Sequence, residues 1–461
     1  MSILTSYIVP HPPLIVPEVG RGQENKIMDT INAYHNVARE ISEIKPETIV
    51  VITPHSVIYQ DYIHISPGKK ASGNLKQFGN FKTSIEVDYD VELVSKLEEL
   101  AIQNEISAGT LGEKSKKLDH GTIVPLYFIN QCFEDYKIVR ISISGLSFLD
   151  HYRFGKCIKE SVESLRRKVV IIASGDLSHR LKNDGPYSYA EEGPIFDKKV
   201  TEYMKTADFM GFLNFDEGFC ELAGECGLRG FIIMAGALDG YSLESDFLSY
   251  EGTFGVGYAV CKYRVAGDAE ERHFDLRYEE ELAKRMERIK VEEDEYVKLA
   301  RKSLESYVKN RKYIDIPEDV PKELLENKAG VFVTLNKDGR LRGCIGTISP
   351  VEDCIANEII RNAVSAGTGD PRFDPVTIEE LPELVYSVDV LGEAEEVSDE
   401  SELDALKYGV IVSKGFRRGL LLPNLEGVKT PRQQIEIALQ KAGISPNESY
   451  KLERFEVVRH T

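Results

Sequence analysis

Apolar segments alternate with helical patterns through the first half of the chain. Strand-like apolar runs occupy residues 3–9, 48–52, 138–144 and 169–173. Between the first two runs, apolar side chains recur every three or four residues from Ile27 to Ile44, which is the spacing of one buried helix face. Another helical stretch covers about residues 150–168. This alternation predicts an α/β domain with a mostly parallel sheet, whose β-branched strands are buried on both faces.

The pattern changes after Tyr263. Residues 264–296 are dense in charge and poor in large apolar side chains, so we expect a charged linker or bridging helix there. Further on, the chain predicts helices and strands without strict alternation, at residues 297–309, 330–336, 385–391 and 431–442, with a hairpin around Lys414 and Gly415. This mixture is typical of a smaller α+β domain. The expected domains are therefore residues 1–263 and 297–461, joined by residues 264–296.

Composition narrows the function classes. The 461 residues include 57 Lys and Arg against 76 Asp and Glu, a net charge of −19, which excludes nucleic acid or an anionic membrane as the main partner. No window approaches the ~18 uninterrupted apolar residues of a membrane span, and the first residues lack the basic segment of a signal peptide. Seven Cys without a CxxC pair fit neither a disulfide scaffold nor a structural zinc site. We expect a cytoplasmic protein.

Four of the nine histidines lie in short polar motifs. They are His11 in VPHPP, His55 in ITPHS, His120 in LDHGT and His179 in SGDLSH. His11, His55 and His179 directly follow predicted parallel strands, and ligands in such sheets bind outside the carboxyl ends of the strands. Any one of them alone could be an ordinary loop residue, but the set predicts loops that converge on one crevice.

Metal binding is the chemistry that best fits such a crevice. Two neutral imidazoles and one carboxylate hold Fe(II) while leaving positions open for substrate and O2. The remaining two histidines would then be free for proton transfer, since their ordinary pKa lies near neutrality. Asp176 could fix the tautomer of a histidine, or it could stabilise a turn.

The third metal ligand has two candidates, Glu225 and Cys226. Neighbouring residues on a helix diverge by about 100°, so only one of them should point at the metal. A carboxylate from Glu225 would make a hard, iron-like site, whereas a thiolate from Cys226 would favour zinc or copper. Glu225 could instead be a carboxylate placed at a helix N-terminus by the helix dipole.

Together these motifs resemble the LigB-like class III extradiol dioxygenases, including the Memo branch of that superfamily. The resemblance covers about residues 1–263 and is carried by His11-Pro-Pro13, Pro54-His55, Asp119-His120-Gly121, Val124-Pro125-Leu126 and Gly175-Asp-Leu-Ser-His179. It implies a metal held by His11, His55 and a late acidic residue, with His120 and His179 lining the substrate pocket and His179 as the base. Ring-cleaving members carry Glu as the third ligand and Memo-type members carry Cys before Gly. This sequence contains both patterns, Glu225 and Cys226 before Gly227.

The second domain resembles the AMMECR1 family. Its signature is Leu341-Arg-Gly-Cys-Ile-Gly346, supported by Gly330-Val-Phe-Val-Thr334, Asp370-Pro-Arg-Phe373 and Gly419-Leu-Leu-Leu-Pro423. Fusions of these two kinds of domain are similar to the AmmeMemoRadiSam system proteins, which implies a radical-SAM protein as partner. Arg342, Cys344 and Arg372 form a candidate second site. Cys344 could be a reactive thiolate beside a cation, although a small buried apolar side chain is the favoured interpretation. Arg372 could equally pair with a carboxylate in a turn.

The leading functional prediction is a metal-dependent oxidoreductase that uses Fe(II) and O2 on a small catechol-like aromatic substrate. His179 would take a phenolic proton and His120 would assist by hydrogen bonding or by donating a proton later. A zinc hydrolase on the same ligands is the first alternative. A Memo-like metal-binding protein without ring-cleaving activity, or a non-enzymatic adaptor, is the other.

Overall fold

The structure of the chain is a computed structural model that describes residues 2–112, 114, 117–337, 339–425 and 427–461. The chain divides into two compact units, Met1–Glu280 and Glu281–Thr461. The first unit is an α/β domain and the second combines antiparallel sheets with helices, so both predicted fold classes are confirmed. Within the described residues, no helix is both long enough and apolar enough to cross a membrane.

An eight-stranded sheet organises the first unit, with strand order β4-β5-β7-β2-β8-β1-β10-β9. Neighbouring strands from β5 to β1 are parallel, and the pairs at both edges are antiparallel. A short parallel pair, β3 (Ile63–His64) and β6 (Ala108–Gly109), lies outside this sheet. The eight strands are β1 (Ile3–Val9), β2 (Thr48–Thr53), β4 (Lys70–Asn74), β5 (Ser84–Tyr89), β7 (Lys137–Ser142), β8 (Val169–Ser174), β9 (Tyr241–Glu251) and β10 (Tyr258–Asp268).

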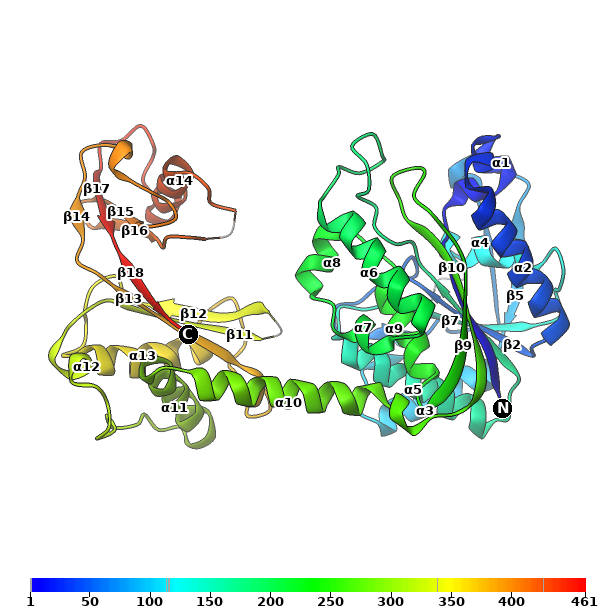
Figure 1. Cartoon of the computed structure of the whole chain (residues 1–461), viewed down its shortest axis with the longest axis horizontal. Coiled ribbons are helices and arrows are strands. Elements are labelled where there is room, and N and C mark those ends of the chain that lie inside the picture. Colours follow the sequence, from blue (N-terminus) through cyan, green and yellow to red (C-terminus); the bar gives the residue numbers. More distant parts are fainter. Residues whose placement is uncertain (1, 113, 115–116, 338, 426) are drawn as a thin grey trace. The chain divides into compact units, whose positions relative to one another are not determined.

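Helices cover both faces of this sheet (Figure 1), because alternate side chains of the central strands are apolar on both sides. In β2, Val50 and Ile52 join one core cluster, and Ile49 and Val51 join the other. The helices of this unit are α1 (Pro17–Gly20), α2 (Met28–Ile44), α3 (Val91–Gln103), α4 (His120–Ile129), α5 (Phe148–Ser164), α6 (Glu192–Thr206), α7 (Phe209–Leu213), α8 (Glu217–Ala223) and α9 (Leu228–Ala237). The carboxyl ends of the parallel strands are left for loops, which carry the predicted histidines.

Two four-stranded antiparallel sheets form the second unit, in the orders β12-β11-β13-β18 and β14-β17-β15-β16. Helices α11 and α13 pack on the first sheet and α14 on the second. The helices are α11 (Glu295–Asn310), α12 (Lys322–Glu326), α13 (Ile355–Thr368) and α14 (Pro431–Ala442). The strands are β11 (Val331–Lys337), β12 (Arg340–Gly346), β13 (Val385–Leu391), β14 (Glu395–Glu396), β15 (Gly409–Lys414), β16 (Arg417–Leu421), β17 (Lys451–Phe455) and β18 (Val457–His460).

The predicted charged linker is formed by the end of β10 and by helix α10 (Phe274–Glu292). Near the start of α10, Asp275 is buried and accepts a hydrogen bond from the ammonium of Lys156 at 2.6 Å. Just beyond its end, the buried Glu293 binds the guanidinium of Arg301. The division between the two compact units falls inside α10, where most side chains are exposed.

Candidate metal centre

His11 follows β1 and is almost completely buried. Its backbone N–H donates to Oδ1 of Asp176 at 2.8 Å, and its Nδ1 lies 3.1 Å from Oγ of Ser174. Ser174 gives its only hydroxyl proton to the carbonyl of Gly121, so its oxygen accepts the proton of His11 Nδ1. The other ring nitrogen, Nε2, therefore carries a lone pair that is available to a metal.

His55 follows β2 and presents its own Nε2 to that of His11, at 2.9 Å. Two ligands at right angles around one cation, with bonds of about 2.1 Å, lie about 3 Å apart. Burial lowers the pKa of His11 well below its ordinary value, and the neighbouring His55 adds to this effect. Burial also lowers the pKa of His55. Both rings are therefore neutral near pH 7, which is the form that binds metals.

Cys226 completes a set of three metal-ligand atoms. Its Sγ lies 3.7 Å from Nε2 of His11, and the ligand atoms of His11, His55 and Cys226 all lie within 4.8 Å of one another. Burial raises the pKa of the Cys226 thiol well above its ordinary value. A cation at this point would supply the positive charge that the thiolate needs, so the three donors fit a divalent metal.

Glu225, one of the two candidates for the third ligand, turns toward the helix that follows it. Its Oε2 accepts a hydrogen bond from the backbone N–H of Leu228 at 2.7 Å, at the beginning of α9. The carboxylate thus satisfies a free donor of the helix N-terminus, where the dipole favours negative charge. Because adjacent side chains diverge, this orientation leaves Cys226 to face the two histidines. Of the two candidates for the third ligand, the geometry therefore favours Cys226.

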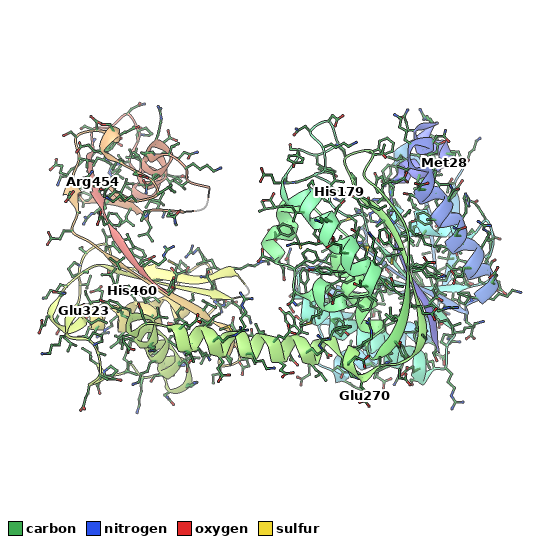
Figure 2. All side chains as sticks on the ribbon, viewed as in Figure 1. Met28, His179, Glu270, Glu323, Arg454 and His460 are labelled. Carbon is green, nitrogen blue, oxygen red and sulfur yellow. The ribbon has the colours of Figure 1, made fainter. Side chains whose placement is uncertain are left out.

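His120 and His179 lie beside the three ligands. His120 is the first residue of α4, and its ring centroid is 4.0 Å from that of His55 and 5.4 Å from that of His11. Burial, followed by the charges of His55 and His11, lowers the pKa of His120 to about 4. His179, labelled in Figure 2, lies in the loop after β8, and its Nδ1 bonds to the carbonyl of Gly224. Its Nε2 is thereby left to accept a proton.

Asp176 connects the ligands to His179. Its Oδ2 lies 3.9 Å from Nε2 of His11 and 4.0 Å from Nε2 of His179. Burial raises the pKa of this carboxyl, whereas the charge of His179 acts in the opposite direction. Since Oδ1 also accepts from the backbone of His11, Asp176 holds the strand-end loop and faces both rings.

Sequence reasoning missed several residues that position this site. Asp119 caps α4, because its carboxylate accepts a hydrogen bond from the backbone N–H of Thr122. The same carboxylate accepts a hydrogen bond from the hydroxyl of Thr53. The oxygen of Thr53 in turn accepts a hydrogen bond from the backbone N–H of His55. The Asp119–Thr122 spacing is a helix-start signal that could have revealed this role. No sequence pattern marks the roles of three further residues, Ser174, Phe78 and Tyr187. The rings of the last two lie against His120 and His179 at centroid distances of 5.3 and 5.2 Å.

Of the candidate second site, Arg372 and Cys344 share one partner, Asp370, whereas Arg342 has a different partner. Arg342 is paired with Glu380, with 2.7 Å from Nε to Oε1. Arg372 binds the carboxylate of Asp370, which also accepts the backbone N–H of Cys344 at 2.9 Å. The turn interpretation of Arg372 therefore agrees with the structure. Cys344 is partly exposed, contrary to the favoured interpretation of a buried apolar side chain.

Comparison with known proteins assigns both domains to families. Residues 5–261 match the family described as the catalytic LigB subunit of aromatic ring-opening dioxygenase, and residues 297–460 match the AMMECR1 family. The chain thus belongs to the LigB family and carries an AMMECR1 domain at its C-terminal end. Since LigB-family proteins bind a metal, the His11–His55–Cys226 cluster is a candidate for the metal site.

Several relatives share one or both domains. Protein CA_C1420 of Clostridium acetobutylicum is 46% identical over 469 aligned positions, which cover 100% of this chain and 99% of that protein. A protein of Thermotoga maritima is 52% identical over 170 positions, covering 36% of this chain and 98% of its own length. The crystal structure of the uncharacterized protein PH0010 from Pyrococcus horikoshii is 35% identical, covers 36% of this chain and 88% of that chain, and has a TM-score of 0.34.

Proposed function

We propose that the N-terminal domain is a metal-dependent oxidoreductase that acts with O2 on a small catechol-like aromatic substrate. The observation that carries this proposal is the convergence of His11, His55 and Cys226, whose ligand atoms lie within 4.8 Å of one another. Membership of a family described by aromatic ring-opening dioxygenase activity supports the substrate class. The proposed ion is Fe(II).

Three protein ligands leave coordination positions open for other molecules. A bound divalent ion supplies a template for substrate and O2 and lowers the pKa of a coordinated hydroxyl group. The chain's own part is to hold the ligands in their metal-binding form. Ser174 does this for His11 by accepting its Nδ1 proton. Asp119, through Thr53, holds the backbone of His55 in place.

Proton transfer is assigned to His179. Its Nδ1 proton is committed to the Gly224 carbonyl, so Nε2 can accept the proton of a substrate hydroxyl. Asp176, 4.0 Å from that Nε2, stabilises the imidazolium that results. His120, kept neutral by burial, hydrogen-bonds the substrate or returns a proton in a later step.

The thiolate of Cys226 favours a second candidate function. Thiolate ligands are soft and shift metal preference toward zinc or copper. On a zinc ion the same arrangement would suit a hydrolase in which His179 activates a water molecule, or a Memo-like metal-binding protein that opens no ring.

Metal content and O2 consumption test the proposal. Protein purified without oxygen should contain about one iron per chain and should consume O2 with at least one member of a catechol panel. Zinc in place of iron, with no O2 uptake after iron loading, would contradict ring opening and support the second candidate. An empty site in a correctly folded protein would favour a non-enzymatic adaptor.

A radical-SAM protein is the proposed partner, on the strength of the fused architecture alone. Copurification from cells that express both proteins tests it, with the isolated AMMECR1 domain as the comparison. Absence of a complex under both aerobic and anaerobic conditions would contradict a stable partnership.

A further inference from the structure

The first turn of α4 contacts the loops that carry the metal-binding histidines. The carbonyl of Gly121 accepts the hydroxyl proton of Ser174, which in turn supports the ring of His11. Gly121 also lies close to the end of β2, because a Cβ atom there would be only 2.4 Å from Oγ1 of Thr53. His120 is itself the first residue of this helix. The start of α4 therefore has to be placed accurately for the metal centre to form.

A buried arginine lies near this helix end. Arg140 belongs to β7, where residues Ile138 to Ser142 are all buried, and only 2% of it is exposed. Its strand partner is Val51 of β2, so the two side chains project from the same face of the sheet. Val51 lies in the core cluster that includes Ile123 and Val124 of α4. A charge in such a position is unfavourable unless hydrogen bonds and an opposite charge compensate it.

The contacts of the Arg140 guanidinium provide this compensation. Nε donates to Oγ of Ser66 at 2.7 Å, and Nη1 donates to the carbonyl of Lys117 at 2.7 Å. Nη1 also lies 3.5 Å from Oδ2 of Asp119, a carboxylate that is itself mostly buried. Lys117 and Asp119 lie directly before α4, so the arginine holds the segment from which the helix starts.

Asp119 connects this arginine to both neighbouring histidines. Its carboxylate caps the helix that begins at His120, by accepting the backbone N–H of Thr122. The same carboxylate accepts the hydroxyl proton of Thr53, whose oxygen accepts the backbone N–H of His55. A displacement of Asp119 would therefore move the supports of both histidines.

We propose that Arg140 is a positioning residue of the metal centre, acting through Asp119 on the metal ligand His55 and on His120. This inference rests on the metal site of the proposed function. The action is indirect, because the guanidinium holds the segment before α4 and that segment sets the positions of the two histidines. Removal of such a supporting partner usually weakens metal binding about 10- to 100-fold.

The opposite end of β2 provides a matched control. There, Asp90 caps α3 and accepts the hydroxyl proton of Thr48, while Nε of Arg167 lies 3.0 Å from Oδ2 of Asp90. The same three kinds of residue, an arginine, a helix-capping aspartate and a threonine, are thus joined at both ends of one strand. The metal ligand His55 follows the other end of this strand.

Cobalt(II) affinity of the full-length protein, measured by competition with a chelator, tests the role of Arg140. Arg140→Gln should bind cobalt about 10- to 100-fold more weakly than wild type, and Arg140→Lys, which keeps the charge, should lose less. Arg167→Gln and Arg167→Lys should keep the wild-type affinity. Thermal unfolding measures the stability of each variant, which is the only property that a purely structural role would change. If Arg140→Gln does not fold, the two lysine variants carry the comparison.

A double-mutant cycle shows whether the effect depends on the contact between Asp119 and Thr53. Thr53→Val removes the hydroxyl that links Asp119 to His55, so it should itself weaken cobalt binding. Arg140→Gln added to Thr53→Val should then weaken binding less than Arg140→Gln does alone, because both changes interrupt one chain of contacts.

Three results would each overturn the proposal. They are wild-type affinity in Arg140→Gln, equal losses of affinity in Arg140→Gln and Arg167→Gln, and losses that simply add in the double variant. A wild type that binds no cobalt would contradict the metal site itself, and this inference with it.

Discussion

The Nε2 atoms of His11 and His55 face each other at 2.9 Å, although the two residues are 44 positions apart in the chain. The topology explains this approach, because β1 and β2 are separated in the sheet by a single strand, β8, and all three are parallel. Their carboxyl ends meet at one edge. A third loop, after β8, brings His179 to the same edge. The metal cluster is thus a product of strand order.

The roles of two histidines at this edge are separable. His179→Gln should keep its metal and lower turnover about 10²- to 10⁴-fold, the usual effect of removing a positioned acid or base. His55→Ala should instead lose the metal, since one of three protein ligands is gone. Elemental analysis and O2 uptake measure both properties. A His179→Gln protein as poor in metal as His55→Ala would make His179 a ligand and contradict its role as base.

Ser174 should control metal affinity without touching the metal. Ser174→Ala removes the acceptor of the His11 Nδ1 proton, so the ring loses its fixed tautomer and orientation. Loss of such a partner weakens metal binding by about 10- to 100-fold, which competition with a chelator measures. Ser249→Ala is the matched control, because its buried hydroxyl has no hydrogen-bond partner among the described residues. Equal affinities of the two variants would contradict this role.

Asp197 should make the stability of the first domain pH-dependent. Burial raises the pKa of this carboxyl to about 7, although Tyr250 and the backbone of Ser178 donate hydrogen bonds to it. The folded state therefore holds a proton that the unfolded state releases near pH 4. The stabilising contribution is complete below that pH and is lost as the pH rises through about 7.

Asp197→Asn removes this titration. The free energy of unfolding of the variant minus that of wild type should be about 2–4 kcal/mol greater at pH 8 than at pH 4. Chemical denaturation at both pH values gives the difference, in which the contributions of all other groups cancel. A difference that does not change with pH would show that folding does not raise the pKa of Asp197.

The two compact units should separate at α10. Between Leu276 and Arg285 this helix is mostly exposed, so limited proteolysis should cut there first and leave two folded fragments. Fragment masses locate the cut, and cooperative thermal unfolding of each fragment shows that it is folded. Early cuts inside either unit, with α10 intact, would contradict this division.

The strand-end histidines were predictable because two simple patterns coincide in them. Strands β1, β2 and β8 are mostly apolar and almost wholly buried, and a histidine follows each of them within a few residues. The choice between Glu225 and Cys226 was not predictable, because it depends on which side chain turns back to accept the Leu228 N–H. The support that Ser174 gives to His11 comes from a neighbouring strand, so no local sequence pattern marks it.

Cobalt(II) binding tests whether His11, His55 and Cys226 form a metal site. A thiolate ligand produces a sulfur-to-cobalt charge-transfer absorption band, whereas carboxylate and imidazole ligands do not. This band should appear in the wild type and in Glu225→Gln, with about one cobalt per chain, and should be lost in Cys226→Ser. A wild-type complex without the band, or a band that survives in Cys226→Ser while Glu225→Gln loses the metal, would contradict this assignment.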